Sequence, residues 1–256
     1  MNTQINAFLG APIAHRGYHD ITQGRPENSL AAISAAIRAG YGIEIDIQAS
    51  ADHQAMVFHD YDLGRLTCEN GPVRQRLAED LSQITLNGCD EGIPTLAKVL
   101  DLVAGQVPLV IEIKDQDGAM GSNVGKLENA VAQDLRSYKG PVVVMSFNPH
   151  SVALFKDLLP EIPRGLITGA YSEEHSQILP ATVRDRLREI RDYERVGASF
   201  VSHQSTDLNR PRIMELKNSG AAILCWTVKS ELAEHEARKI ADNITFENYP
   251  ASIPET

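Results

Sequence analysis

Residues 29–48, SLAAISAAIRAGYGIEIDIQ, combine an alanine-rich segment that predicts a helix over 29–39 with a β-branched strand over 42–48. Gly40 stands where the glycine that follows a helix end is expected. The same alternation recurs along the chain. Strands are expected at residues 12–14, 42–48, 108–114, 141–147, 164–168, 199–203, 221–228 and 243–246. Strands that alternate with helices through short connections predict a parallel sheet with helical crossovers.

About eight strands in 256 residues favour an α/β fold, a closed (β/α)8 TIM-type barrel. The alternative is an open doubly wound sheet, but no G-x-G-x-x-G follows the first strand and no P-loop occurs. Further helices are expected at 96–104, 127–137, 149–159, 210–218 and 231–239. An extra short strand at 57–59 and a polar stretch at 61–94, with one helix near 77–84, predict a small helical insertion after the second barrel strand. Residues 1–256 are therefore expected to form one domain.

The composition limits the classes of function. The formal net charge of −10 argues against a nucleic-acid binder, and it leaves room for divalent cations. Cys68, Cys89 and Cys225 form no C-x-x-C pair, so a disulfide framework or cysteine-rich zinc site is not expected. Residues 1–12 do not resemble a signal peptide, and no apolar run approaches the ~18 residues of a membrane span. We expect a cytoplasmic protein; the sequence does not indicate its oligomeric state.

Two predicted strands carry charged residues where a parallel barrel should be apolar on both faces. Glu44 and Asp46 alternate with isoleucines, and Glu112 and Lys114 do the same. If the isoleucines pack under the helices, the charged groups point toward the barrel axis. Crowded carboxylates in a partly dry space need protonation, basic partners or a cation, and all-oxygen ligands suit Mg²⁺ or Ca²⁺. The alternative is a strand with one solvated face.

Two histidines are expected at strand ends, where barrel enzymes place their chemistry. His15 follows the first strand, and His59 follows a short apolar run. A histidine pair can supply one proton and take another at neutral pH, although either residue alone could be structural. The guanidinium of Arg16 suits a phosphate, with a surface ion pair as the alternative. Trp226 could pack against a bound ligand, or be a core aromatic.

Three other polar positions have a structural interpretation as well. Asn28 or Ser29 is expected to cap the first helix. Glu27 either complements the dipole of that helix or lies beside a bound ion. His203 is expected to be a hydrogen-bonded core histidine.

The blocks H-R-G (15–17), P-E-N-S (26–29), E-I-D-I (44–47) and V-F-H-D (57–60) resemble the glycerophosphodiester phosphodiesterase family in type, order and spacing. The resemblance continues through I-P-T-L (93–96), I-E-I-K (111–114), M-S-F (145–147) and C-W-T-V (225–228). It depends most on the amino-terminal blocks and covers nearly the whole chain. Two departures are evident: Lys229 stands where the family often has Asn, and T-F-E-N-Y-P (245–250) replaces its T-D-x-P.

The resemblance implies a metal-dependent hydrolysis of glycerophosphodiesters, such as glycerophosphocholine or glycerophosphoethanolamine, to sn-glycerol 3-phosphate and an alcohol. It implies that one Mg²⁺ or Ca²⁺ binds to Glu44, Asp46 and Glu112. His15 and His59 would act as general acid and base, while Arg16 and Lys114 would hold the phosphate of this small-molecule substrate. Which histidine is the acid, and whether water or a substrate hydroxyl attacks, are left open.

Two other functions are compatible with the sequence. One is a lysophospholipase D-like or phospholipase-type phosphodiesterase, which must meet a lipid surface. The chain shows no basic amphipathic helix, and only 5% of its residues are aromatic. The other is a barrel that binds phosphodiesters without hydrolysing them, a role that gives no reason for two histidines.

Overall fold

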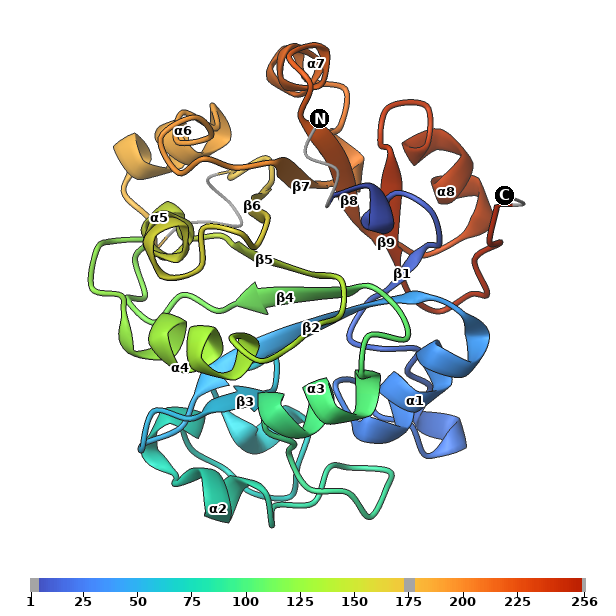
Figure 1. The fold of residues 1–256 in the computed structure, drawn as a ribbon, viewed down its shortest axis with the longest axis vertical. Helices are drawn as coiled ribbons and strands as arrows, with labels where there is room; N and C mark the ends of the chain where they lie inside the picture. Colours follow the sequence, from blue (N-terminus) through green and yellow to red (C-terminus); the bar gives the residue numbers. More distant parts are fainter. Residues whose placement is uncertain (1–4, 173–177, 255–256) are drawn as a thin grey trace.

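Parallel strands close into a barrel in the computed structural model, which describes residues 5–172 and 178–254 (Figure 1). Within these residues, eight parallel strands pair in the order β1-β9-β8-β7-β6-β5-β4-β2, and β1 also pairs with β2 to complete the circle. The strands are β1 (Ile13–Ala14), β2 (Gly42–Ala49), β4 (Leu109–Ile113), β5 (Val142–Ser146), β6 (Arg164–Thr168), β7 (Phe200–Gln204), β8 (Ala222–Val228) and β9 (Asn243–Phe246). The predicted TIM-type barrel is confirmed, and the open sheet is wrong.

Helices cover the outside of the barrel (Figure 1). They are α1 (Leu30–Ala39), α3 (Leu96–Val103), α4 (Lys126–Leu135), α5 (Pro149–Leu158), α6 (Ala181–Arg188), α7 (Pro211–Asn218) and α8 (Glu231–Ala237). All but α6 were predicted, with ends that differ by a few residues at most. Gly40 ends α1 in the left-handed conformation at φ 75°, as its position in the sequence indicated. No helix of the described chain is long and apolar enough to cross a membrane.

The insertion lies at the side of β2, in the lower part of Figure 1. β3 (Ala55–Val57) pairs antiparallel with β2 and lies two residues earlier than the predicted short strand. The chain then forms the 3-10 turns η3 (Leu63–Arg65) and η4 (Val73–Gln75) and the short helix α2 (Ala78–Leu81). Apolar side chains of this segment pack in a small cluster of their own with Met56 and Phe58. The segment is thus anchored beside the end of β2.

The interior of the barrel is apolar at one end and charged at the other. Ile43, Ile45 and Ile47 pack in the outer core under the helices, as predicted. A second apolar cluster, which includes Phe200 and Leu224, fills the apolar end of the barrel interior. Ile5 and Phe8 of η1 (Ile5–Phe8) belong to this cluster and close that end. The side chain of Asn243 anchors this amino-terminal plug by donating to the carbonyl oxygens of Phe8 and Ala11, each at 2.8 Å.

Candidate active site

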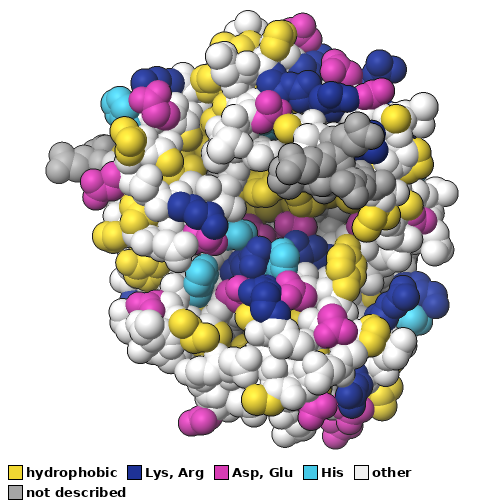
Figure 2. Space-filling view, turned by 180° about the vertical axis from the view of Figure 1, so that it is seen from behind, with side chains coloured by type: hydrophobic (Ala, Val, Ile, Leu, Met, Phe, Trp, Pro, Cys, Tyr) yellow, Lys and Arg dark blue, Asp and Glu magenta, His cyan; other side chains and the backbone are white. Residues whose placement is uncertain are grey.

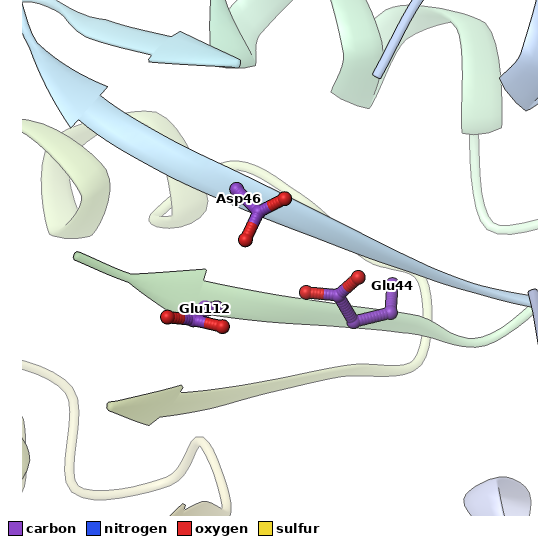
Figure 3. A group of neighbouring side chains, drawn as sticks. All are labelled: Glu44, Asp46 and Glu112. Atoms are coloured by element: carbon purple, nitrogen blue, oxygen red, sulfur yellow. The ribbon is translucent and has the colours of Figure 1, made fainter. Parts of the chain in front are cut away.

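Three carboxylates from adjacent strands form the centre of the site. Glu44 and Asp46 extend inward from β2 and Glu112 from β4, where the register places Asp46 directly opposite Glu112. One oxygen of each lies within 4.8 Å of the others, and Figure 3 shows the three side chains together between these strands. The residues are only 1%, 1% and 8% exposed. The predicted inward orientation of all three is confirmed, and a strand with a solvated face is wrong.

Two basic side chains neutralise only part of this charge. The Nζ atom of Lys114 lies 2.7 Å from an oxygen of Asp46 and 2.7 Å from an oxygen of Glu112. The Nε atom of Arg16 lies 3.3 Å from Asp46. Burial favours a neutral Asp46, but the charges of Lys114, His59 and Arg16 together outweigh it and lower the pKa of that carboxyl. Asp46 is therefore ionised and held by two cations.

Glu44 and Glu112 lie in a different electrostatic environment. Burial, reinforced by the charge of Asp46, raises the pKa of Glu44 well above its usual range. Burial also raises the pKa of Glu112, against the opposing effect of Lys114. The Oε1 atom of Glu44 is buried, and no residue that the structure describes donates a hydrogen bond to it. The carboxylates thus retain an unpaired buried oxygen.

The segment before α1 holds Asp46 in place. Ser29 is the N-cap, and its hydroxyl accepts a hydrogen bond from Ala32 N, as predicted for one of the two candidates. Asn28 does not cap the helix. Its amide donates to Asp46 Oδ2 at 2.9 Å and accepts from the backbone N–H of Asp46 at 3.3 Å. Asn28 is 1% exposed and adopts a left-handed backbone at φ 61°.

His15 follows β1 and is held by a carboxylate that the sequence did not indicate. Its Nδ1 atom lies 2.6 Å from Glu247 Oε2, and its Nε2 atom lies 4.0 Å from Glu44. Burial lowers the pKa of His15, although Glu247 opposes the shift. The hydrogen bond with His15 in turn lowers the pKa of Glu247, which also pairs with Lys229 at 2.7 Å. The two departures from the family pattern therefore contact each other.

His59 has a similar arrangement on the other side of the carboxylates. Its Nδ1 atom lies 2.5 Å from Asp60, whose pKa falls to about 2, mainly through the hydrogen bonds that Arg65 of the insertion donates. Arg65 also donates two hydrogen bonds of 2.8 Å to Glu27, which accepts another from Arg16 at 2.7 Å. Burial, together with Lys114, lowers the pKa of His59. Glu27 is thus linked to the acidic cluster through Arg16, which also contacts Asp46.

These side chains surround a cavity of about 90 Å³ at the open end of the barrel. Figure 2 shows a hollow on this face, with histidine, basic and acidic side chains gathered around it. Of the eight predicted site residues, only Asp46 does not line the cavity; the others are His15, Arg16, Glu44, His59, Glu112, Lys114 and Trp226. A second hollow of about 240 Å³ shares His59, Glu112 and Lys114 with it. Larger surface hollows lie elsewhere and contain none of the three carboxylates.

Apolar side chains form the opposite wall. Trp226 donates its indole N–H to the carbonyl of Ser202 at 3.1 Å, and its ring meets Phe147 edge to face at 5.5 Å. His203, by contrast, is fully buried and bonds to Thr168 at 2.7 Å, outside the cavity lining. The expectation of a hydrogen-bonded core histidine is confirmed.

Fold and site together define a barrel enzyme whose centre combines buried carboxylates, two imidazoles and two cations at the carboxyl ends of the strands. The family model described as the Glycerophosphoryl diester phosphodiesterase family matches residues 15–246. The chain belongs to this family, and it is an enzyme of the phosphoric diester hydrolase class.

Individual relatives agree over most of the chain. A glycerophosphodiester phosphodiesterase of Bacillus subtilis is 25% identical over 257 residues, which are 93% of this chain and 83% of the relative. Another, from Caldanaerobacter subterraneus, is 31% identical over 163 residues, 60% of this chain and 65% of the relative. The solved structure of an Oleispira antarctica phosphodiesterase, in complex with the product sn-glycerol-3-phosphate, matches 96% of this chain and 95% of its own at TM-score 0.77 and 24% identity, which supports the shared fold.

Proposed function

We propose that this enzyme hydrolyses glycerophosphodiesters to sn-glycerol 3-phosphate and an alcohol, with one Mg²⁺ or Ca²⁺ and two catalytic histidines. The observation that carries the proposal is that Glu44, Glu112, His15 and His59 line one cavity, and that Asp46 completes the carboxylate cluster beside it. The names of the relatives support the same substrate class.

The acidic cluster fits a hard divalent ion. Its donors are all carboxylate oxygens, and the cations Lys114 and Arg16 balance two of the three negative charges. The unpartnered oxygen of Glu44 provides a buried position that a cation would satisfy. When bound, such an ion withdraws charge from a phosphoryl oxygen and orients the diester for in-line attack. Glu44, Asp46 and Glu112 would hold it.

The two imidazoles can divide the proton transfers between them. Each has its Nδ1 atom against a carboxylate, so its other ring nitrogen is left for the reaction. One imidazole removes the proton from the attacking water or substrate hydroxyl, and the other protonates the departing alkoxide. Arg16 and Lys114, both in the cavity wall, hold the phosphate oxygens, and Trp226 packs against the carbon groups of the substrate.

The test is a panel of glycerophosphodiesters with different head groups, assayed for sn-glycerol 3-phosphate release in chelator and with Mg²⁺ or Ca²⁺ added back. We expect release that the chelator abolishes and one of the ions restores. His15→Ala and His59→Ala should each lower kcat about 10²–10⁴-fold. His235→Ala, at an exposed histidine of α8, is the matched control and should change nothing.

Three outcomes would contradict the proposal. Turnover of lysophosphatidylcholine in preference to glycerophosphocholine would indicate a lipid-directed phosphodiesterase. Binding of the diester without product would indicate a non-catalytic barrel. Activity within about threefold of wild type in both histidine variants would refute the acid–base assignment.

A further inference from the structure

The ends of β8 and β9 bring a charged pair to the outer side of His15. Lys229 directly follows β8 and Glu247 directly follows β9. The backbone fixes their positions, because Glu247 N donates to Val228 O at 3.0 Å and His15 N donates to Phe246 O at 2.9 Å. The Glu247 carboxylate therefore lies between the imidazole and the ammonium group.

Both oxygens of Glu247 have a partner. Oε2 lies 2.6 Å from His15 Nδ1, and Oε1 lies 2.7 Å from Lys229 Nζ. His19 adds a third basic neighbour, with its Nε2 atom 3.7 Å from Oε2. The side chain of Glu247 is 12% exposed, whereas that of Lys229 is 62% exposed. An ionised carboxylate is only an acceptor, so the ring nitrogen that it contacts must carry the hydrogen.

We propose that Glu247, oriented by Lys229, is a positioning residue that holds His15 in the Nδ1-protonated form with Nε2 directed at the reacting phosphate. The inference rests on the proposed function, since it assigns His15 a proton transfer. His59 shows the same geometry, with Asp60 on Nδ1 and Arg65 on Asp60. Both imidazoles are thus oriented by a carboxylate that a cation holds.

The pair allows a prediction that depends on Lys229. In Glu247→Gln the single amide oxygen is attracted to the ammonium group of Lys229, which can only donate. The amide NH₂ then faces His15 Nδ1 and favours the opposite tautomer, with the hydrogen on Nε2. Adding Lys229→Met releases the amide, which can rotate and accept from Nδ1 again. The second substitution should therefore partly reverse the effect of the first.

Steady-state kinetics of the metal-loaded enzyme on glycerophosphocholine test this dependence. We expect E247Q to lower kcat about 10²–10³-fold, with KM changed less than about threefold. K229M alone should lower kcat by a smaller factor, and K229M/E247Q should recover about tenfold over E247Q. E236Q, which removes a carboxylate from the exposed Glu236–Lys239 pair, is the matched control and should leave both constants unchanged.

The ¹⁵N resonances of the histidine rings, assigned with His15→Gln, report the tautomer without turnover. We expect hydrogen on Nδ1 of His15 in the wild type and on Nε2 in E247Q. An unchanged tautomer in E247Q, or a kcat within about threefold of wild type, would overturn the inference. If the wild type hydrolyses no glycerophosphodiester with either ion, the proposed function fails, and the resonances still decide how Glu247 holds His15.

Discussion

Asn28 offers a direct test of how the first helix is coupled to the acidic centre. Replacing it by Ala removes the hydrogen bond to the Asp46 carboxylate and the one from the Asp46 backbone N–H. It also places a residue other than Asn or Gly at φ 61°. All three effects destabilise the folded state in the same direction.

The expected loss can be worked out from these contacts. A hydrogen bond to a charged group contributes about 1.5–3 kcal/mol, and a neutral one about 0.5–1.5 kcal/mol. A left-handed alanine costs roughly 1–2 kcal/mol. Asn28→Ala should therefore lower the free energy of unfolding by about 3–6 kcal/mol. Because Asn28 fixes the orientation of Asp46, the affinity for the divalent ion should also fall about 10–100-fold.

Urea denaturation without metal measures the first effect, and calorimetric titration with Mg²⁺ or Ca²⁺ measures the second. Asn248 provides a matched control, since it is exposed and also left-handed, at φ 68°. Asn248→Ala should show the backbone cost, about 1–2 kcal/mol, and the loss of one exposed hydrogen bond of 3.4 Å to Glu247. If Asn28→Ala destabilises no more than Asn248→Ala, or binds the ion as tightly as wild type, the coupling inferred here is wrong.

Three further predictions concern the metal and the barrel interior. At about 100 times its Kd, the divalent ion should stabilise the folded protein by about 2.7 kcal/mol, which raises Tm by roughly 5–11 °C. Glu44→Gln should abolish this rise in Tm. An equal rise in both proteins would exclude Glu44 as a ligand. Phe8→Ala should lower the free energy of unfolding, measured in urea, by about 3–5 kcal/mol, because the ring is buried at the apolar end of the barrel interior. A decrease below about 1 kcal/mol would contradict this. Gly165→Ala should lower the free energy of unfolding by about 1–3 kcal/mol, because the added methyl group would overlap the Phe200 ring. Adding Phe200→Leu should restore part of this stability. An unchanged urea midpoint in Gly165→Ala would refute the close approach of Gly165 and Phe200.

The sequence predicted the barrel because its signals are local and repeated. Each strand between β2 and β9 is bounded by turn residues, and each predicted helix has an apolar side for the barrel. The helix α6 lacks such a local signal. Leu187 is its only buried residue among those the structure describes, so its sequence lacks the periodic apolar stripe that identifies an outer helix. β3 was displaced by two residues because pairing with β2, rather than propensity, sets its position.

The site could be predicted where a strand carries its own signal. Alternating charges placed Glu44, Asp46 and Glu112 on one face, and this depends only on the two-residue period of a strand. Asn28 was assigned to a cap because capping is a rule about near neighbours, whereas its partner lies 18 residues away. Glu247 is 232 residues from His15 along the chain. Only ring closure, which pairs β1 with β9, brings these two together.

The distribution of cations separates the carboxylates of the site into two groups. Glu247 and Asp60 each combine an imidazole with a Lys or Arg partner, so their pKa values fall and they stay ionised as hydrogen-bond acceptors. Glu44 and Glu112 have raised pKa values, because burial is not offset by enough positive charge. A divalent ion would supply the missing positive charge beside Glu44 and Glu112. Glu247 and Asp60 are already neutralised by their own basic partners. In the proposed function, Glu247 and Asp60 orient the histidines, whereas Glu44 and Glu112 would hold the metal together with Asp46, which Lys114 and Arg16 keep ionised.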